Sequence, residues 1–312
     1  MVYFYSDREQ TVDLSVRFPG GLITEWYPQA TQIGPSKLST NSEGAQPAVT
    51  ADSSIIRWPN VHVLANGGQS SSPNLAQDQS GSHYFTARQT DANIVEVQTG
   101  ADNQVEREKF LFYRGVANFE APLHVALDQS EAATLENRSG NPLADLFLLR
   151  VKDGRGQFVH VKKLGSGETR TVSVDLDHNG QLLAELDQRL GDEMARALVG
   201  QGLFEREAEA MVATWKDSWF EEPGIRVLYL LPRPWTDTVL PMKMTPVPTH
   251  LERVMVGRAE LVPPGVEEEL AKLVKQASKD PAANNRVQQI ERELGRFAGP
   301  IVERASGSSY YE

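Results

Sequence analysis

The 312-residue sequence contains no cysteine. Thiol catalysis, disulfide bonds and zinc held by thiolates are therefore excluded together. A cysteine-free chain avoids misoxidation in an oxidising compartment, which favours a secreted or periplasmic protein over a cytoplasmic one. Met1 leads directly into the strand-like run Val2–Tyr5, which suits a chain whose natural N-terminus and signal segment have been removed.

Long hydrophobic runs and an excess of basic residues are also lacking. The longest apolar runs, Leu146–Leu149 and Val227–Leu231, are too short to span a bilayer, so no membrane insertion is expected. The chain carries 31 basic and 42 acidic residues, with 15 and 21 of them in residues 1–180 and therefore 16 and 21 in residues 181–312. This evenly acidic surface repels phosphate backbones and anionic lipid, so nucleic acid is not an expected partner.

Nucleotide-binding and nucleophile motifs are missing as well. The sequence has no Gly-x-Gly-x-x-Gly opening a helix, no Gly-Lys-Ser/Thr and no Gly-x-Ser-x-Gly elbow between a strand and a helix. The six histidines lie far apart, and we interpret them as satisfied side chains, the alternative being a zinc site gathered from distant strands.

No cofactor is predicted, with calcium as the alternative. Residues 175–180 place oxygen donors Asp175, Asp177 and Asn179 at alternate positions before Gly180. Leu186 occupies the place where an EF-hand loop has its closing glutamate, so this is not an EF-hand. The preferred interpretation is that Asn179 and Gly180 cap a helix.

The periodicity predicts an α+β fold. Alternation over residues 12–18 indicates a half-buried strand, and a further strand is expected at 84–88. Helical stripes cover residues 182–198 and continue from Phe204 to Trp219. Strands are expected to return at 226–231, 238–244 and 253–261, before two final helices.

Four segments follow from this pattern. Residues 1–115 form a β-rich region whose polar stretches 29–54 and 66–82 are long loops, and residues 116–178 form an Ig-like sandwich. Residues 179–262 hold a helical pair and strands that could share a sheet with the N-terminal region. Residues 263–312 form a helical hairpin and tail, whose stripe from Val287 to Ile301 could join a second copy in a homo-oligomer, although packing on its own domain is preferred.

The most distinctive segment runs from Thr214 to Pro223 and places two tryptophans beside three carboxylates. Aromatic platforms next to paired acids are typical of clefts that cleave glycosides. Asp217 and Glu221 are four residues apart and would share one face of an α-helix, which makes them the candidate catalytic pair. The opposing interpretation is that Trp215 and Trp219 continue the core stripe and Asp217 faces solvent.

Six further side chains are candidates for binding rather than chemistry. An arginine at the end of an expected strand could clamp a carboxylate with two hydrogen bonds, or pair with acids of its own chain. The candidate binding residues are Trp215, Trp219, Glu222, Arg226, Arg88 and Arg114.

Several stretches resemble a set of uncharacterised bacterial proteins that are often exported. They are Tyr3–Ser6, Gly21–Pro28, His83–Arg88, Glu108–Gly115, Trp215–Glu222 and Val256–Glu260. The resemblance spans most of residues 3–260, with Trp215–Glu222 its most specific part. It implies export and adds no activity.

Two classes of function stay open from the sequence. The preferred hypothesis is an extracytoplasmic binding or assembly module without catalytic activity, which has a protein or a glycan as partner. The alternative is a hydrolase, acting on carbohydrate through the carboxylates near Trp219.

Overall fold

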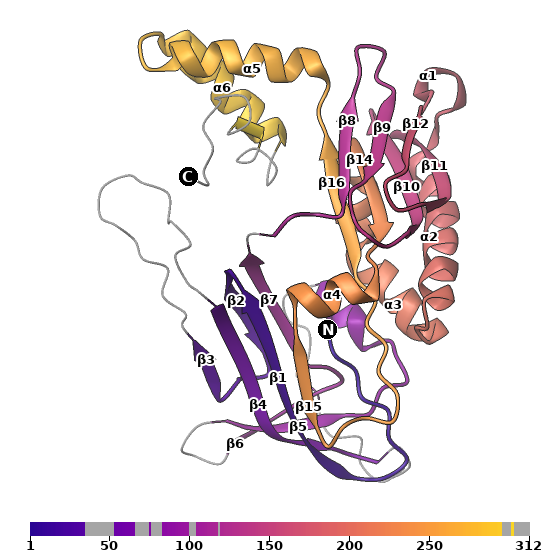
Figure 1. The fold of residues 1–312 in the computed structure, drawn as a ribbon, viewed down its shortest axis with the longest axis vertical. Coiled ribbons are helices and arrows are strands. Elements are labelled where there is room, and N and C mark those ends of the chain that lie inside the picture. The colour runs from indigo at the N-terminus through magenta and orange to yellow at the C-terminus, as the bar shows by residue number, and fades with distance from the viewer. Residues whose placement is uncertain are drawn as a thin grey trace. The chain divides into compact units, whose positions relative to one another are not determined.

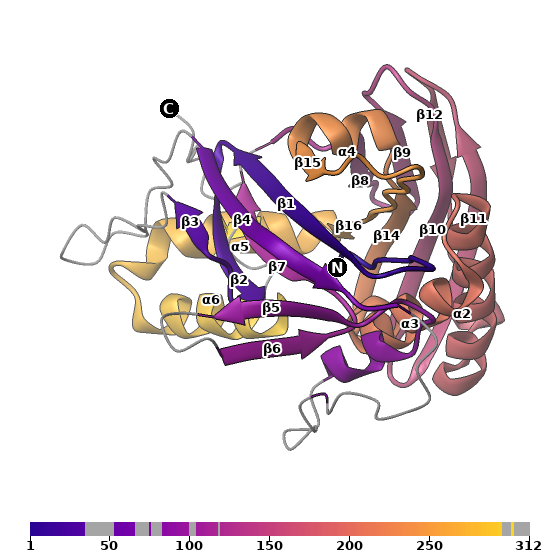
Figure 2. The same cartoon turned by 90° about the horizontal axis from the view of Figure 1, so that it is seen from below.

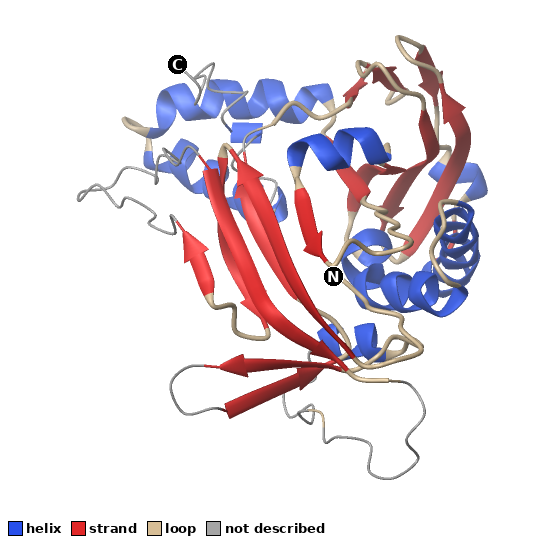
Figure 3. Ribbon diagram, turned by 60° about the horizontal axis from the view of Figure 1, so that its bottom comes forward, coloured by secondary structure: helices blue, strands red, loops and turns tan. Residues whose placement is uncertain are grey.

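The computed structural model confirms the predicted α+β class, with antiparallel sheets and helices (Figure 3). It describes residues 1–34, 53–65, 75, 83–99, 104–117, 119–294 and 301–302. Most of the two expected polar loops, at 29–54 and 66–82, lies outside these described residues.

The chain divides into two compact units, each assembled from three separate stretches. The first unit contains Met1–Ala121, Gly191–Asp217 and Leu231–Met255. The second contains Pro122–Leu190, Ser218–Leu230 and Val256–Glu312. The stretch between residues 179 and 262 therefore contributes to both units.

A six-stranded antiparallel sheet forms the centre of the first unit (Figures 1 and 2). Its main path has the order β15-β1-β4-β5-β6, and β3 pairs with β4. The strands are β1 (Gln10–Pro19), β3 (Gln32–Gly34), β4 (Ser53–Val63), β5 (Val95–Thr99), β6 (Gln104–Glu108) and β15 (Met242–Thr245). A strand from residue 242 onward thus pairs with the first strand of the chain.

The alternation in β1 explains which face of this sheet is buried. Val12, Leu14, Val16 and Phe18 are buried, because successive side chains of a strand point to opposite faces. They pack with Trp58, whose indole nitrogen donates a hydrogen bond to the carbonyl of Pro28 at 2.9 Å. A separate ribbon of β2 (Gly21–Tyr27) and β7 (Phe112–Ala117) contributes Ile23 to the same core.

Two antiparallel sheets build the second unit. The larger has the order β13-β11-β10-β14-β16, and the smaller has the order β12-β9-β8. The strands are β8 (Leu123–Leu127), β9 (Ala133–Asn137), β10 (Leu143–Lys152), β11 (Arg155–Leu164), β12 (Thr169–Val172), β13 (Gln181–Leu182), β14 (Gly224–Leu230) and β16 (Val256–Leu261). The segment 116–178 therefore supplies strands to both sheets, and strands from later in the chain complete the larger one.

The helices follow the apolar stripes seen in the sequence. They are α1 (Leu176–Asn179), α2 (Leu183–Gly200), α3 (Glu205–Lys216), α4 (Arg233–Val239), α5 (Pro264–Ala277) and α6 (Pro281–Leu294). Gly156 of β11 allows close approach of α2, since a Cβ there would lie 2.5 Å from Leu186 Cδ2.

Two expected strands are wrong. His83–Arg88 forms η1, a 3₁₀ helix, in which Ala87 is buried with Phe110 and Phe112. The stretch 238–244 begins inside α4 and becomes a strand only at β15. Pro234 in the first turn of α4 favours the helix there, because proline lacks only a donor that the first turn does not use.

Candidate functional site

The segment Trp215–Glu222 ends α3 and continues as η2 (Asp217–Glu221), a π-helical turn. Trp219 and Phe220 are buried, whereas Trp215 is partly exposed. Trp215 belongs to the first unit, where its ring meets the edge of Tyr84 at a centroid distance of 5.9 Å. Both tryptophans thus pack against the protein's own side chains.

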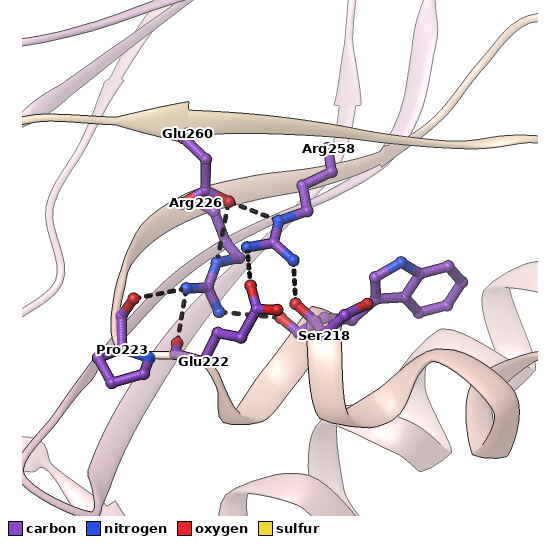
Figure 4. A network of polar contacts seen from close by, with 7 residues as sticks. Ser218, Glu222, Pro223, Arg226, Arg258 and Glu260 are labelled. Atoms are coloured by element: carbon purple, nitrogen blue, oxygen red, sulfur yellow. Dashed lines mark hydrogen bonds and ion pairs between the residues drawn. The ribbon is translucent and has the colours of Figure 1, made fainter. Parts of the chain in front are cut away.

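Two arginines from neighbouring strands cap the C-terminal end of η2 (Figure 4). Arg226 of β14 donates to the carbonyl oxygens of Trp219 at 3.2 Å, Glu222 at 2.6 Å and Pro223 at 3.0 Å. Arg258 of β16 donates to the carbonyl oxygen of Ser218. The last carbonyls of a helix have no partner within it, so these guanidinium groups satisfy them.

Two glutamates balance the charge of these arginines. Arg226 and Glu260 are directly opposite each other in the β14–β16 ladder, which places both side chains on one face of the sheet. Glu260 Oε1 accepts from Arg226 Nε at 3.2 Å and also from Arg258 Nε. Glu222 Oε2 accepts from Arg258 Nη2 at 2.6 Å. We call Glu222, Arg226, Arg258 and Glu260 the arginine network.

The arginine network is deeply buried at its centre. The side chain of Arg226 has no exposed surface, and that of Glu260 is 12% exposed. Burial lowers the pKa of Arg226 from its ordinary value, while the charge of Glu260 opposes this shift. Arg226 and Glu222, both predicted as binding residues, are therefore placed in contacts that hold η2 against the sheet.

The predicted catalytic pair occupies the two ends of η2. Asp217 is its first residue and is exposed; Glu221 is its last residue and is partly exposed. The turn that joins them has π-helical rather than the expected α-helical geometry. The carboxylate that joins the arginine network is the neighbouring Glu222.

The two other predicted arginines bind carboxylates of the same chain, in the first unit. Arg88 grips Glu108, with Nη2 2.6 Å from Oε2 and Nε 2.9 Å from Oε1, and the Glu108 side chain is only 2% exposed. Arg114 pairs with Glu25 at 2.9 Å, but this pair is exposed at 57% and 43%. Arg88 therefore clamps a carboxylate with two nitrogens, as the sequence suggested, and the carboxylate is that of Glu108 in the same chain.

The candidate calcium loop contains a capped helical turn. Asp175 Oδ1 accepts from the backbone nitrogen of His178 at 3.2 Å, and its Oδ2 lies 2.9 Å from His178 Nδ1. The backbone nitrogen of Gly180 bonds to the carbonyl of Leu176 and ends α1. Asp175 thus acts as the N-cap of α1.

The dispersed histidines include one well-anchored side chain in the second unit. His160 Nε2 lies 2.9 Å from Asp145 Oδ1, and its ring stacks on Phe147 at a centroid distance of 4.0 Å. Within the part of the chain that the structure describes, no three His, Asp or Glu side chains are grouped to hold a metal ion.

A cluster missed by the sequence reasoning joins the N-terminal segment to the start of α3. The rings of Tyr5 and Phe204 meet edge to face at 4.7 Å, and the two residues are 38% and 59% exposed. Glu207 accepts from the backbone nitrogen of Phe204 at 3.1 Å and from the Tyr5 hydroxyl. Burial raises the pKa of Glu207, and burial together with the Glu207 charge raises the pKa of Tyr5. We call Tyr5 and Phe204 the aromatic pair.

The aromatic pair was hidden by the helical pattern. Phe204 fits the apolar stripe of Ala208 and Met211, which predicts a buried ring. The helix begins only at Glu205, so Phe204 occupies the N-cap, and the residue is 59% exposed. One feature of the sequence could have indicated that the helix begins after Phe204. Glu207 lies three residues after this position, as the glutamate of a capping box does.

No protein-family model and no curated protein matches the sequence, which is consistent with a protein that has no known family function. Among the described helices, none is both long and apolar enough to cross a membrane.

Proposed function

We propose that the protein is an extracytoplasmic binding or assembly module without catalytic activity. The observation that carries this proposal is the aromatic pair, because two rings held in place yet open to solvent are suited to contact a partner. The extracytoplasmic location is supported by the absence of cysteine from 312 residues.

The surroundings of the aromatic pair favour recognition of a protein or a glycan. Arg206 follows directly on Glu205 and forms an ion pair with Asp91. Aromatic and arginine side chains are enriched at protein interfaces, and exposed rings beside polar groups also suit the apolar faces of sugars. The excess of 42 acidic over 31 basic residues disfavours nucleic acid.

Five of the binding residues predicted from sequence have partners within the chain, which turns attention to the aromatic pair. Glu222, Arg226 and Arg88 are engaged in contacts within the chain, and the rings of Trp215 and Trp219 pack internally. Side chains that are held in this way stabilise the fold, so a structural role explains these five residues.

We expect Phe204→Ser to weaken partner binding at least tenfold, as loss of a central aromatic contact typically does. Serine is a favoured N-cap residue, so α3 should keep its stability. Binding is measured by biolayer interferometry on ligands selected from a glycan array and a peptide-display library. Val247→Ser is the matched control, since Val247 is 84% exposed and lies outside the aromatic pair. Equal binding by wild type and Phe204→Ser would contradict the role of this pair.

One observation keeps the hydrolase as a second candidate. π-Helical turns are rare and are often found at functional sites, and η2 carries Asp217 and Glu221 at its ends. The binding proposal predicts no turnover of chromogenic glycosides above buffer by the wild-type protein. Turnover that is abolished by Glu221→Gln, with an unchanged melting temperature, would instead establish the hydrolase.

A further inference from the structure

Carboxylates outnumber bases around the aromatic pair. Glu205 and Glu207 lie in the first turn of α3, directly after the N-cap residue Phe204. Arg206, in the same turn, forms an ion pair with Asp91, and the side chains of this pair are 56% and 66% exposed. Three carboxylates therefore accompany one guanidinium group in this part of the first unit, which gives it a negative charge.

Lys109 is a further base in this region and does not reverse the balance. Its ammonium group donates to the carbonyl of Thr90 at 2.7 Å. Burial lowers the pKa of Lys109 and the charge of Arg206 adds to this shift, while the charge of Asp91 opposes it. With Lys109 included, the three carboxylates still exceed the two bases.

The negative charge acts at the aromatic pair itself. Burial raises the pKa of Tyr5, and the charges of Glu207 and Asp91 raise it further. Both of these charged groups are carboxylates, so they produce a negative potential at the Tyr5 hydroxyl. A potential that disfavours the phenolate at this position attracts a cation to it.

The geometry of the two rings suits a cation as well. Their planes are inclined by 67°, so the pair itself covers at most one of the four ring faces. The face of an aromatic ring is its negative side and attracts a cation. Glu207 accepts from the backbone nitrogen of Phe204 at 3.1 Å and from the Tyr5 hydroxyl, so the rings are positioned before any partner binds.

The charge of the whole first unit adds to this attraction. Its three stretches contain 21 acidic and 14 basic residues, whereas the complete chain contains 42 and 31. The first unit thus has a net charge of −7 out of −11. A basic partner is attracted by this charge during its approach, an acidic protein or an acidic glycan is repelled, and a neutral glycan gains nothing from it.

We propose that the aromatic pair receives a lysine or arginine side chain of a basic partner protein, with the cation on a ring face and close to Asp91 and the first turn of α3. A basic side chain uses both the rings and the carboxylates, whereas a neutral sugar uses the rings alone. This inference rests on the proposed function and specifies the chemistry of the partner at the same site.

Fluorescence anisotropy with labelled peptides tests the charge of the partner on the full-length protein. The probe is a peptide that alternates lysine and glycine, and the comparison peptides carry norleucine or glutamate in place of lysine. We expect the lysine peptide to bind at least about fivefold more tightly than either comparison peptide at low salt, and its affinity to fall as salt is added. Equal binding of the lysine and norleucine peptides would overturn the proposal.

Variants at position 204 separate the ring contact from the general attraction between an acidic protein and a basic peptide. Phe204→Ser leaves the charge unchanged and should weaken binding of the lysine peptide about fivefold, the size of an exposed cation–π contact. Phe204→Leu should be as weak as Phe204→Ser, whereas Phe204→Trp should bind at least as tightly as the wild type. Wild-type affinity in both Phe204→Ser and Phe204→Leu would contradict a cation on the ring.

A matched pair of charge variants tests the role of the carboxylates. Asp91→Asn should weaken binding of the lysine peptide, because it removes a negative charge beside the rings. Glu25→Gln removes the same charge at an exposed ion pair elsewhere in the first unit and should leave the affinity nearly unchanged. Equal losses in the two variants would mean that only the net charge acts, which is contrary to the proposal.

The outcome also separates this inference from the proposed function. A glycan or an uncharged peptide that binds the wild type and is lost in Phe204→Ser, while the lysine peptide does not bind, would overturn the basic partner and leave the binding site standing. If no ligand of the wild type responds to Phe204→Ser, the binding site and the basic partner are both wrong.

Discussion

Arg226→Ala is expected to lower the free energy of unfolding by about 3–5 kcal/mol, the usual cost of removing one partner from a buried ion pair. Arg226 is fully buried and donates to three carbonyl oxygens as well as to Glu260. Its loss removes the Arg226 donors from the three carbonyl oxygens, in a place that a short side chain cannot fill, although Glu260 keeps its contact with Arg258. Urea denaturation followed by circular dichroism gives the free energy.

Two further variants distinguish the contribution of the Arg226 hydrogen bonds from that of its positive charge. Arg226→Lys keeps the charge but offers a point-like ammonium in place of a planar fork, so it should recover only part of the stability. Arg114→Ala removes an arginine whose partner Glu25 is 43% exposed, and it should cost at most about 1 kcal/mol. If Arg226→Ala were as mild as Arg114→Ala, the arginine network would not be what holds η2.

Glu108→Ala is expected to cost about 3 kcal/mol in the first unit, again because a largely buried pair loses one partner. Its carboxylate accepts from Arg88 through three N–H contacts and from the backbone nitrogen of Lys109 at 2.8 Å. Alanine removes all of these contacts and leaves the Arg88 side chain, which is 16% exposed, without this carboxylate. Thermal and urea unfolding measure the loss, and Glu25→Ala is the matched control at an exposed pair.

A tyrosine titration checks the same variant independently of stability. The pKa of Tyr27 is raised by burial first and then by the nearby charge of Glu108, while Arg88 lowers it. Removing the negative charge at position 108 should therefore bring the pKa of Tyr27 down toward its ordinary value. Ultraviolet absorbance titration detects the phenolate. An unchanged titration curve in Glu108→Ala would mean that this carboxylate does not act on Tyr27.

The local patterns of the sequence were sufficient for most elements. Alternation in residues 12–18 and the apolar stripe of 182–198 predicted β1 and α2, because both signals depend only on which side chains must be buried. At His83–Arg88 the pattern led to the wrong prediction of a strand, since two neighbouring aromatic residues are consistent with a strand and with a short helix alike. The packing of Ala87 with Phe110 and Phe112 decided for the helix.

The site residues were harder to predict than the elements. The sequence placed Arg226, Glu222 and Trp219 within one short stretch, which suggested a cleft. Arg258 and Glu260 are more than thirty residues away, and only the pairing of β14 with β16 brings them to Arg226. That pairing makes Arg226 and Glu222, which were predicted as binding residues, part of a structural network.

By itself the sequence determined the α+β class, the acidic surface and the absence of any thiol chemistry. These three properties depend only on composition and on local periodicity. The periodicity arises because each element must bury its apolar side chains on one face. Only the tertiary structure decided the order of strands, the internal partners of Arg88 and Arg226, and the exposure of Phe204. The physical reason is that each of these depends on contacts between residues distant in the chain or on where a helix begins, and hydrophobic patterning leaves both open.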